Sequence, residues 1–422
     1  MVELLQAVAP ATAGAQAVLA APRDGAMLIG GRWVQARSGQ RMGTVDPATG
    51  GLLGQFPDAG PEDVDAAVAA ARAAFPGWAA TVPAQRAAIL WRIADILEQH
   101  IDELSELETL DQGKPLYVGR WAEIPGAIGQ FRYYAGQCLS IEGRTITPSV
   151  TYQPAGKQVQ AWTLREPVGV VAAIVPWNSP LVLTAMKLAP ALAAGCTVVL
   201  KPAEDTTLTA LRLGELMMAA GLPDGVLNIV TGRGATTGAA LAAHGDVDKV
   251  AFTGSTATGR AILDASKGNL KRVTLELGGK SPVIVMPDAD LDLAVPGVAN
   301  AIFFNGGQVC VAGSRAYVHA DIYDRVLEGV LAYAQGLALG HGLNPGNPDG
   351  PPCPPPARRN GGRPDRWRPR RRCRRRNRRR PPGTGGHLHR PDRHRRRGAP
   401  DGYRAGGGVR PGPGDAALHR CG

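Results

Sequence analysis

The sequence has no hydrophobic run long enough to cross a membrane, and it has few cysteines. No stretch of about 18 residues is apolar and free of both proline and charge, so no membrane helix is expected. No basic segment of the kind that opens a secretory signal is present, since the first basic residue is Arg23. Six cysteines in 422 residues are too sparse for a disulfide scaffold. We therefore expect a soluble cytoplasmic protein with a sizeable core and two or three domains.

Positive charge is also scarce over most of the chain. Residues 1–350 hold 25 Lys and Arg against 32 Asp and Glu, a net charge of −7. Residues 351–422 hold 22 Arg and four Asp, with no Lys or Glu, a net charge of +18. The overall charge of +11 therefore comes from the tail, and the mildly acidic body gives no reason to expect nucleic-acid binding.

The first part of the chain predicts a loose leader, a hairpin and two helices. Residues 1–22 are rich in alanine and predict a flexible leader. Met27–Ser38 predicts two strands joined by a Gly-Gly turn. Apolar residues at helical spacing predict helices over Pro61–Phe75 and Gln85–Leu110.

The middle of the chain alternates apolar strands with helices. Continuous apolar runs that are separated by helices indicate a parallel sheet covered on both faces, as in nucleotide-binding α/β domains. A further run at Ser281–Met286 begins a second α/β layer, and Ile322–Leu339 predicts a helix. The strands are expected over Val168–Val175, Thr197–Leu200, Val226–Val230 and Lys249–Thr253, and the helices between them over Thr184–Ala194, Leu208–Ala220 and Ala235–Ala243.

Two short motifs that follow predicted strands are typical of a nucleotide site. Gly254–Gly259 (G-S-T-A-T-G) leads into a helix, and its glycines allow the backbone to approach a phosphate. Lys201–Glu204 (K-P-A-E) places an acid where it can bind ribose hydroxyls and repel a 2′-phosphate, which favours NAD over NADP. The first motif also fits an ordinary turn, and the second also fits a solvated loop.

Two other segments contain candidates for chemistry. Asn178 lies in Pro176–Pro180, at the carboxyl end of a predicted strand, where its side-chain N–H can stabilise an oxyanion. The same segment also fits a proline-bounded turn. Cys310 follows a Gly-Gly turn and can act as an exposed nucleophile, with Glu276 as a general base. Cys196 precedes a β-branched run and fits a small core residue instead.

Taken in order, these segments resemble the motifs of the NAD(P)-dependent aldehyde dehydrogenase superfamily. The resemblance runs from about residue 27 to residue 350, and its wording is nearest to phenylacetaldehyde-type dehydrogenases. It implies a Rossmann-type NAD-binding domain and a second α/β catalytic domain that is incomplete here. The matching stretches are P-W-N from Pro176, K-P-A-E from Lys201, F-T-G-S-T from Phe252, L-E-L-G-G-K from Leu275 and F-F-N-G-G-Q-V-C from Phe303.

The resemblance implies covalent oxidation of an aldehyde to a carboxylic acid. The Cys310 thiolate attacks the aldehyde to form a thiohemiacetal, whose oxyanion the Asn178 side chain and the Cys310 N–H hold. Hydride transfer to NAD leaves a thioester, and Glu276 activates the water that hydrolyses it. Lys187 matches a family lysine with an implied role in proton relay.

The resemblance also implies the partners and the cofactor contacts. It favours a small aldehyde substrate, NAD in preference to NADP, a homo-oligomer, and no metal, membrane or nucleic-acid partner. The expected contacts are Lys201 and Glu204 at the adenosine ribose, Gly234, Gly238, Gly254 and Ser255 around the adenine and pyrophosphate, Leu277 and Gly278 beside the nicotinamide, and Ile174, Pro176, Trp177, Phe252 and Thr258 elsewhere in the cofactor site.

The same resemblance divides the chain into segments. An NAD-binding domain is expected over residues 23–141 and 161–275, with a bridging hairpin for oligomerisation over 142–160. A partial catalytic domain is expected over residues 276–348. The family's E-E-x-F-G-P-V stretch and its terminal strand are missing beyond residue 350.

Residues 349–422 predict an aberrant, disordered tail that is rich in Arg, Pro and Gly. Residues 351–422 contain no Ile, Phe or Met, so they have little to bury. A basic arm of this kind can bind nucleic acid. A metal site would need Cys353, Cys373 and Cys421, whose spacing matches no zinc pattern.

We hypothesise a frameshift shortly before residue 349. Out of frame, Asp349–Cys353 can give M-G-P-L-V, Gly385–Arg393 can give G-G-I-Y-I-A-P-T-V, and Gly406–Pro413 can give E-E-V-F-G-P-V. All three peptides resemble family segments, in family order and in one common frame. Resequencing this region tests the hypothesis. Three functions stay open: a dehydrogenase, a cofactor-binding remnant without turnover, and a body with a nucleic-acid-binding arm.

Overall fold

The computed structural model describes residues 6–20, 26–149, 156–344 and 417–421. The chain divides into two compact units, Met1–Pro356 with Gly408–Gly422, and Ala357–Gly407. The second unit lies wholly outside the described residues. The three segments of the frameshift hypothesis also lie outside them. Of the predicted tail, residues 349–422, only β14 (Ala417–Cys421) is described.

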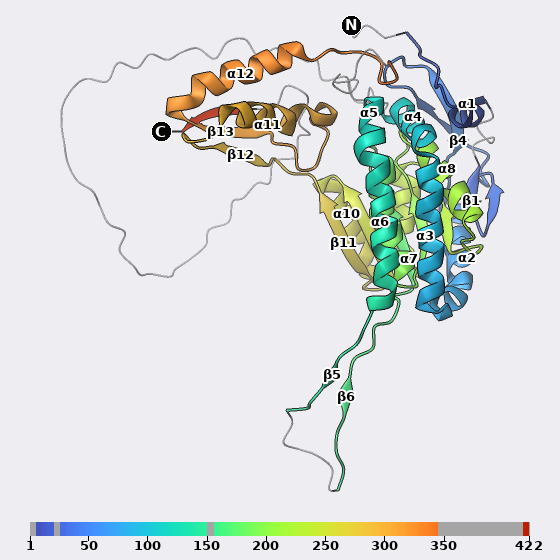
Figure 1. Ribbon diagram of the computed structural model, residues 1–422. Helices are drawn as coiled ribbons and strands as arrows, with labels where there is room; N and C mark the ends of the chain where they lie inside the picture. Colours follow the sequence, from blue (N-terminus) through green and yellow to red (C-terminus); the bar gives the residue numbers. More distant parts are fainter. Residues whose placement is uncertain (1–5, 21–25, 150–155, 345–416, 422) are drawn as a thin grey trace. The chain divides into compact units, whose positions relative to one another are not determined.

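A seven-stranded sheet in the order β11-β10-β7-β8-β9-β1-β2 forms the centre of the first unit (Figure 1). Every residue of its two middle strands, β7 and β8, is buried, which confirms the parallel, doubly covered sheet predicted from the apolar runs. The parallel strands are β7 (Val170–Ile174), β8 (Thr197–Lys201), β9 (Leu227–Ile229), β10 (Lys249–Gly254) and β11 (Arg272–Leu277), and the antiparallel hairpin of β1 (Met27–Ile29) and β2 (Arg32–Val34) joins at β9.

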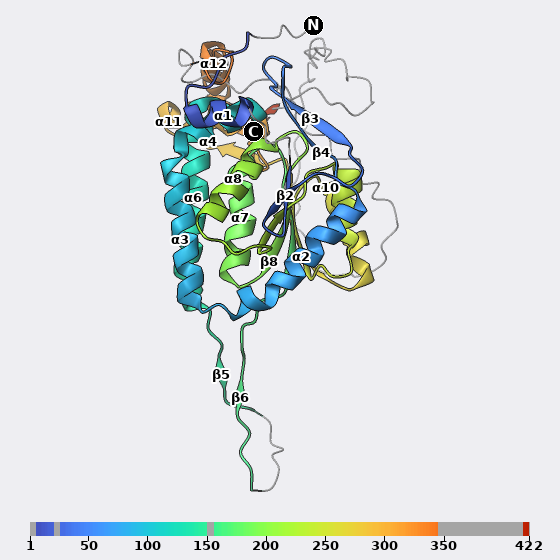
Figure 2. The same ribbon diagram turned by 90° about the vertical axis from the view of Figure 1, so that its right-hand side faces the viewer.

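Helices cover both faces of this sheet (Figure 2). The helices of the described residues, including α11 and α12 of the smaller sheet, are α1 (Ala13–Ala20), α2 (Pro61–Ala80), α3 (Pro83–Gln99), α4 (Ile101–Gln112), α5 (Leu116–Val118), α6 (Ile124–Gln137), α7 (Pro180–Ala193), α8 (Leu208–Ala219), α9 (Ala239–Ala243), α10 (Thr256–Ala265), α11 (Leu291–Phe303) and α12 (Tyr323–Gly336), with short 3₁₀ or π turns η2 (Gly119–Glu123), η3 (Cys138–Ser140), η4 (Gly234–Gly238), η5 (Ser266–Gly268), η6 (Phe304–Gly307) and η7 (Ala320–Ile322). Among the residues that the structure describes, no helix is both long and apolar enough to span a membrane.

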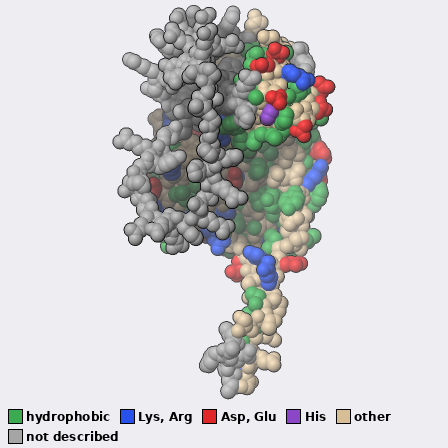
Figure 3. Space-filling view, turned by 90° about the vertical axis from the view of Figure 1, so that its left-hand side faces the viewer, with side chains coloured by type: hydrophobic (Ala, Val, Ile, Leu, Met, Phe, Trp, Pro, Cys, Tyr) green, Lys and Arg blue, Asp and Glu red, His purple; other side chains and the backbone are tan. Residues whose placement is uncertain are grey.

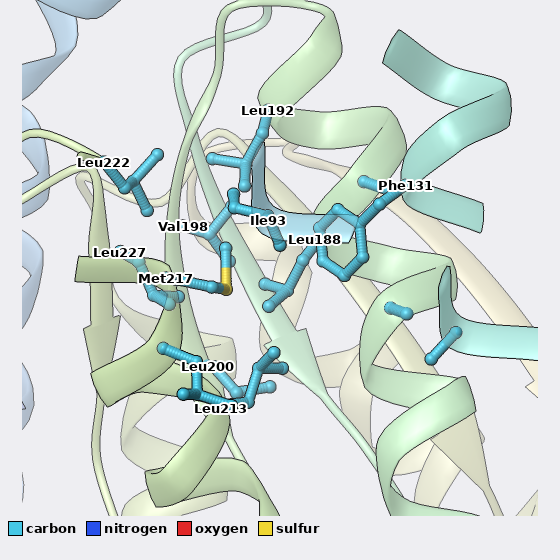
Figure 4. Close-up of a cluster of buried hydrophobic side chains, with 14 of the residues drawn as sticks. Ile93, Phe131, Leu188, Leu192, Val198, Leu200, Leu213, Met217, Leu222 and Leu227 are labelled. Atoms are coloured by element: carbon cyan, nitrogen blue, oxygen red, sulfur yellow. The ribbon is translucent and has the colours of Figure 1, made fainter. Parts of the chain in front are cut away.

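The core is split into two layers by the alternation of the strands. Val171 and Ala173 of β7 face the layer beneath α3, α6, α7 and α8 (Figure 4). Val170 and Ala172 face the opposite layer, beneath α2, α9 and α10. Cys196 is buried in the first layer, so the prediction that it is a small core residue is confirmed.

The structure departs from several sequence expectations, two of which concern the N-terminal part of the described residues. The predicted helix Gln85–Leu110 is two helices, because the backbone at His100 (φ −116, ψ 19) is not helical, and the apolar spacing continues across this break. The predicted loose leader is wrong for Ala13–Ala20, which forms α1. Glu106 of α4 fixes its start by accepting hydrogen bonds from the backbone of Thr12 (2.9 Å) and from its hydroxyl (2.7 Å).

A smaller sheet follows the large one in sequence. β12 (Pro282–Val285), β13 (Arg315–His319) and β14 run parallel, and α11 and α12 pack on them through a small cluster that includes Val298 and Val326. Large apolar side chains stay exposed on these elements, among them Ile284, Met286 and Leu293, and hydrophobic surface is also visible in Figure 3. Two further hairpins pair β3 (Arg41–Val45) with β4 (Leu52–Pro57) and β5 (Thr145–Ile146) with β6 (Ala161–Trp162).

The strand order places a natural ligand position at one edge of the large sheet. From β7 the chain moves outward through β8 to β9, and it then returns to lay β10 on the other side of β7. The order therefore reverses between β7 and β10. Ligands of open α/β sheets bind beyond the carboxyl ends of the strands at such a reversal.

Candidate active site

Cys310 lies in a loop with an unusual backbone. After α11, the residues Asn305 (φ 49), Gly306 (φ 62) and Gly307 (φ 73) are all left-handed. Two of them are glycines, which adopt this conformation without steric cost, and asparagine tolerates it better than most residues. A Cβ at Gly307 would also lie only 3.1 Å from the carbonyl oxygen of Ile302. This tight turn leads to Cys310, whose side chain is exposed, unlike those of Cys138 and Cys196.

Asn178 is joined to this loop by two hydrogen bonds. It follows β7 and precedes α7, at the carboxyl edge of the sheet. Its Nδ2 donates to the carbonyl oxygen of Gln308 at 2.7 Å, and Asn305 Nδ2 donates to the carbonyl oxygen of Asn178 at 3.0 Å. A side-chain amide has two N–H donors, and the bond to Gln308 uses one of them. The other can serve a negative oxygen that forms next to the Cys310 thiol.

Glu276 and Lys187 form an interacting pair of charges. Glu276 is exposed near the end of β11, whereas Lys187 is buried on α7. Burial lowers the pKa of Lys187 to about 8, and the Glu276 carboxylate partly opposes this shift. The segment that carries Glu276 also passes beside the thiol loop, since a Cβ at Gly279 would lie 3.6 Å from the Cys310 carbonyl oxygen. The strand end that carries Glu276 is therefore followed, three residues later, by backbone that lies beside Cys310.

A second group of polar residues gathers at the end of β8. The Lys201 Nζ lies 3.3 Å from Glu204 Oε2 and donates to the Pro202 carbonyl oxygen at 2.8 Å. The Gly234 N–H donates to Glu204 Oε1 at 3.5 Å. Burial raises the pKa of Glu204, but the Lys201 charge and the hydrogen bonds that the carboxylate accepts together outweigh this effect, so the pKa of Glu204 lies below its usual value. A Cβ at Gly238 would lie 3.5 Å from Lys201 Cδ. The half-buried Glu204 carboxylate is thus held ionised between Lys201 and the backbone of Gly234.

The glycine motif after β10 is built as a close strand-to-helix junction. A Cβ at Gly254 would lie 2.5 Å from the Phe252 ring, so no larger residue fits without movement. Ser255 caps α10, because its Oγ accepts a hydrogen bond from the Thr258 N–H at 3.1 Å. The buried Gly259 leaves space for Leu277, whose Cδ2 would lie 2.9 Å from an added Cβ. The start of α10 therefore offers backbone N–H groups at the carboxyl edge of the sheet.

The remaining predicted cofactor residues lie along the same edge. Ile174 ends β7 and is paired with Phe252 of β10, and both are buried. Pro176 and Trp177 are half-buried in the turn that precedes Asn178, and Gly278 is exposed after β11. The structure thus joins Asn178, after β7, to the loop that leads to Cys310, and it joins Lys201, Glu204 and Gly234 after β8 and β9. Glu276 lies near the end of β11, at the same edge of the large sheet as Asn178 and Glu204.

Sequence reasoning missed Gln112, the last residue of α4. Its side chain contacts Asn305 and Gln308 in the thiol loop. The only signal available in the sequence is a run of polar residues at the end of a predicted helix, just before Gly113. Such a run is typical of any helix end, so it did not indicate a contact 193 residues away.

Comparison with known proteins gives consistent matches over most of the chain. The model of the aldehyde dehydrogenase family matches residues 33–360. Phenylacetaldehyde dehydrogenase of Pseudomonas fluorescens is 52% identical over 322 residues, which are 76% of this chain and 64% of the relative. Mitochondrial benzaldehyde dehydrogenase of Antirrhinum majus is 48% identical over 323 residues, which are 76% of this chain and 59% of the relative.

A solved structure matches the fold. The NAD⁺ complex of aldehyde dehydrogenase from Bacillus cereus aligns with a TM-score of 0.77 and 42% identity, over 84% of this chain and 70% of that one. The chain spans less than two thirds of the length of the two curated relatives.

Proposed function

The chain belongs to the aldehyde dehydrogenase family, and from this premise we propose that it oxidises an aldehyde to a carboxylic acid with NAD. The observation that carries the proposal is the 2.7 Å hydrogen bond from Asn178 Nδ2 to the carbonyl oxygen of Gln308, two residues before Cys310. This bond holds an amide donor beside an exposed thiol. An oriented donor next to a nucleophile is the arrangement that addition to a carbonyl group requires.

The proposed reaction uses each group once per turnover. Cys310 Sγ, as the thiolate, bonds to the carbonyl carbon, and the oxygen becomes negative within reach of Asn178 and the Cys310 N–H. NAD, when bound, supplies the acceptor for the two electrons and hydrogen that leave this carbon. Glu276 then takes a proton from water, whose oxygen bonds to the carbon of the thioester as the thiolate leaves. The product is the carboxylic acid, and Lys187 passes the proton onward.

The cofactor contacts are proposals that rest on the residues at the sheet edge. Glu204 offers a carboxylate for ribose hydroxyls, and Lys201 fixes its direction. The start of α10, opened by Gly254 and Ser255, suits a pyrophosphate because its N–H groups carry partial positive charge. The exposed backbone of Gly234, which donates to Glu204 beside Lys201, supports an adenosine position there.

Replacing Glu204 with glutamine is expected to raise the preference for NADP. The substitution removes a negative charge that repels a 2′-phosphate, and the ratio of kcat/KM for NADP to that for NAD should rise by about tenfold. Steady-state kinetics with both coenzymes measure this ratio. Asp264→Asn, at the far end of α10, is the matched control and should leave the ratio unchanged. An equal rise in both variants would contradict the role of Glu204.

Lys187 is expected to give the pH profile of kcat an inflection near pH 8. Activity should rise through this range, because the neutral amine can accept the proton that the reaction releases. Removing the like charge in Lys249→Gln should shift the inflection upward, since Lys249 also lowers the pKa of Lys187. In Lys187→Arg the inflection should vanish, because a guanidinium stays charged. A profile that keeps its inflection in Lys187→Arg would exclude the relay.

Further proposals concern the class of substrate, the oligomeric state and the cellular location of the protein. The two curated relatives named above support an aromatic aldehyde as the substrate. Exposed Ile146 and Trp162 on the β5–β6 hairpin support a role for residues 142–160 in a homo-oligomer. A reactive thiol at Cys310 requires a reducing compartment, which supports the cytoplasm.

The proposed division into two domains rests on the presence of two separate sheets. β11 is the last strand of the large sheet in sequence and ends at Leu277. The small sheet begins with β12 at Pro282. This change of sheet supports a boundary near residue 276 between an NAD-binding domain, residues 23–141 and 161–275, and a partial catalytic domain, residues 276–348.

Turnover of phenylacetaldehyde by the purified chain tests the proposed function. The expected result is formation of NADH and phenylacetic acid in equal amounts. Binding of NAD without turnover would favour the cofactor-binding remnant instead. Salt-dependent binding to RNA would favour the basic arm, which lies in a part of the chain outside the described residues.

A further inference from the structure

Four amide residues form a closed ring of hydrogen bonds around the loop that carries Cys310. Gln112 Nε2 donates to Asn305 Oδ1 at 3.3 Å and to Gln308 Oε1 at 3.2 Å. Asn305 Nδ2 donates to the Asn178 carbonyl oxygen, and Asn178 Nδ2 donates to the Gln308 carbonyl oxygen. The ring joins three segments that are distant in sequence: the end of α4, the turn after β7 and the loop after α11.

Burial makes the ring difficult to replace by water. Gln112 and Asn305 are each only 3% exposed. Asn305 also has a left-handed backbone (φ 49), which costs free energy in a residue other than glycine and persists only where its surroundings hold it. Gln112 supplies that support, because its amide fixes the Asn305 side chain from the side opposite to Asn178.

The helix end that presents Gln112 is itself fixed. Asp111 accepts hydrogen bonds from Thr44 Oγ1 at 2.7 Å and from the Leu208 N–H at 2.8 Å. Glu108, one turn earlier, pairs with Lys114 at 2.6 Å. The last turn of α4 is therefore anchored on both sides of Gln112. Its amide has little freedom to follow a movement of the thiol loop.

We propose that Gln112 is a positioning residue, which sets the direction of the second N–H of the Asn178 amide toward the reacting oxygen at Cys310. The inference rests on the proposed function. Its physical basis is that a shift of about 1 Å in a catalytic group costs on the order of a hundredfold in rate. The four side chains of the ring are amides, which carry no titratable group.

Gln112→Met tests the proposal, because methionine has a similar length but no N–H to donate. We expect kcat to fall by about tenfold to a hundredfold while KM for NAD stays unchanged. Gln112→Asn keeps the amide and should recover part of kcat. Thr109→Val, a buried and nearly isosteric change one turn earlier on α4, is the matched control and should leave kcat within about twofold.

A double-mutant cycle separates positioning from a general loss of structure. If Gln112 acts through Asn178, then Gln112→Met in an Asn178→Ala background should lower kcat no further. Full additivity of the two effects would overturn the proposal. The proposal would also be overturned if Thr109→Val lowered kcat as much as Gln112→Met does while the two variants had the same melting temperature.

Alkylation of Cys310 by iodoacetamide, followed by mass spectrometry of its peptide, needs no turnover. Gln112→Met should change the rate at least about threefold, and Thr109→Val should not. If the unmodified chain oxidises no aldehyde but this difference appears, the proposed function fails and Gln112 still sets the geometry of the loop. If the chain is active and Gln112→Met matches Thr109→Val in both assays, the proposed function stands and the inference about Gln112 fails.

Discussion

Replacing Cys310 with alanine is expected to abolish aldehyde oxidation and leave the fold intact. The thiolate is the group proposed to bond to the carbonyl carbon, so the loss should exceed about a thousandfold in kcat. Cys310 is exposed, and its side chain contributes little to the core. The melting temperature and the affinity for NAD should therefore be unchanged. Absorbance of the reduced nicotinamide measures the loss of activity, and thermal unfolding measures the melting temperature.

Cys196→Ala is the matched control, because Cys196 is buried and lies outside the candidate site. Its effect should be the opposite one: a modest loss of stability, of about 1 kcal/mol, with kcat retained. A Cys310→Ala variant that keeps even a tenth of the original rate would end the assignment of Cys310 as the nucleophile.

Replacing Lys114 with methionine is expected to have the largest effect on stability. Lys114 is fully buried, and its Nζ lies 2.6 Å from Glu108 Oε1 and 3.2 Å from Glu123 Oε1. Its loss leaves two buried carboxylates without a cation, which costs about 3–5 kcal/mol. Urea unfolding measures this loss. Lys267→Met is the matched control, since its pair with Asp264 is exposed and should contribute less than about 1 kcal/mol.

The loss in Lys114→Met should also depend on pH in a defined direction. Burial raises the pKa of Glu108 to about 7, although Lys114 partly opposes this shift. Without Lys114 the pKa of Glu108 in the folded protein rises further above its unfolded value. Stability that depends on the protonated form is present at low pH and is lost as the pH rises through the folded pKa. The variant should therefore be closer to the original at pH 5 than at pH 8. Equal losses at both pH values would contradict this account.

The loss of Lys114 should also affect the candidate active site, because Glu123 contacts the segment after β7. Its Oε1 accepts a hydrogen bond from the Ser179 hydroxyl at 2.9 Å, and Ser179 follows Asn178 directly. Glu108 Oε2 accepts a weak bond from the Leu181 N–H at 3.4 Å, in the first turn of α7. The buried charges thus support the segment that presents the Asn178 amide.

The large sheet was predictable because its strands are buried on both faces. Val170–Ile174 consists entirely of apolar residues, and Thr197–Lys201 has three consecutive apolar residues at its centre, which indicates a buried environment for both strands. β11 was not predicted as a strand, since its residues alternate between exposed and half-buried and include charged Arg272 and Glu276. The helix α11 was missed as well, and Pro296 within it is a residue that usually argues against a helix.

Candidate site residues were accessible from sequence only where a motif marked them. Asn178, Glu276 and Cys310 lie in short segments with a recognisable order. The hydrogen bonds that hold them arise from contacts between distant segments, such as that of Gln112 with Asn305. A pattern of local spacing contains no information about such contacts, and only the fold reveals them.

The edge hairpin of the large sheet places a constraint on how the chain folds during synthesis. Leu28 of β1 is paired with Ile229 of β9, and the Gly30 N–H donates to Asn228 Oδ1 at 2.8 Å. The hairpin leaves the ribosome before its partner strand, which follows about 200 residues later. At translation speeds of about 5–20 residues per second, the apolar face of β1 waits ten seconds or more. This segment is therefore a natural client for chaperones that bind nascent chains.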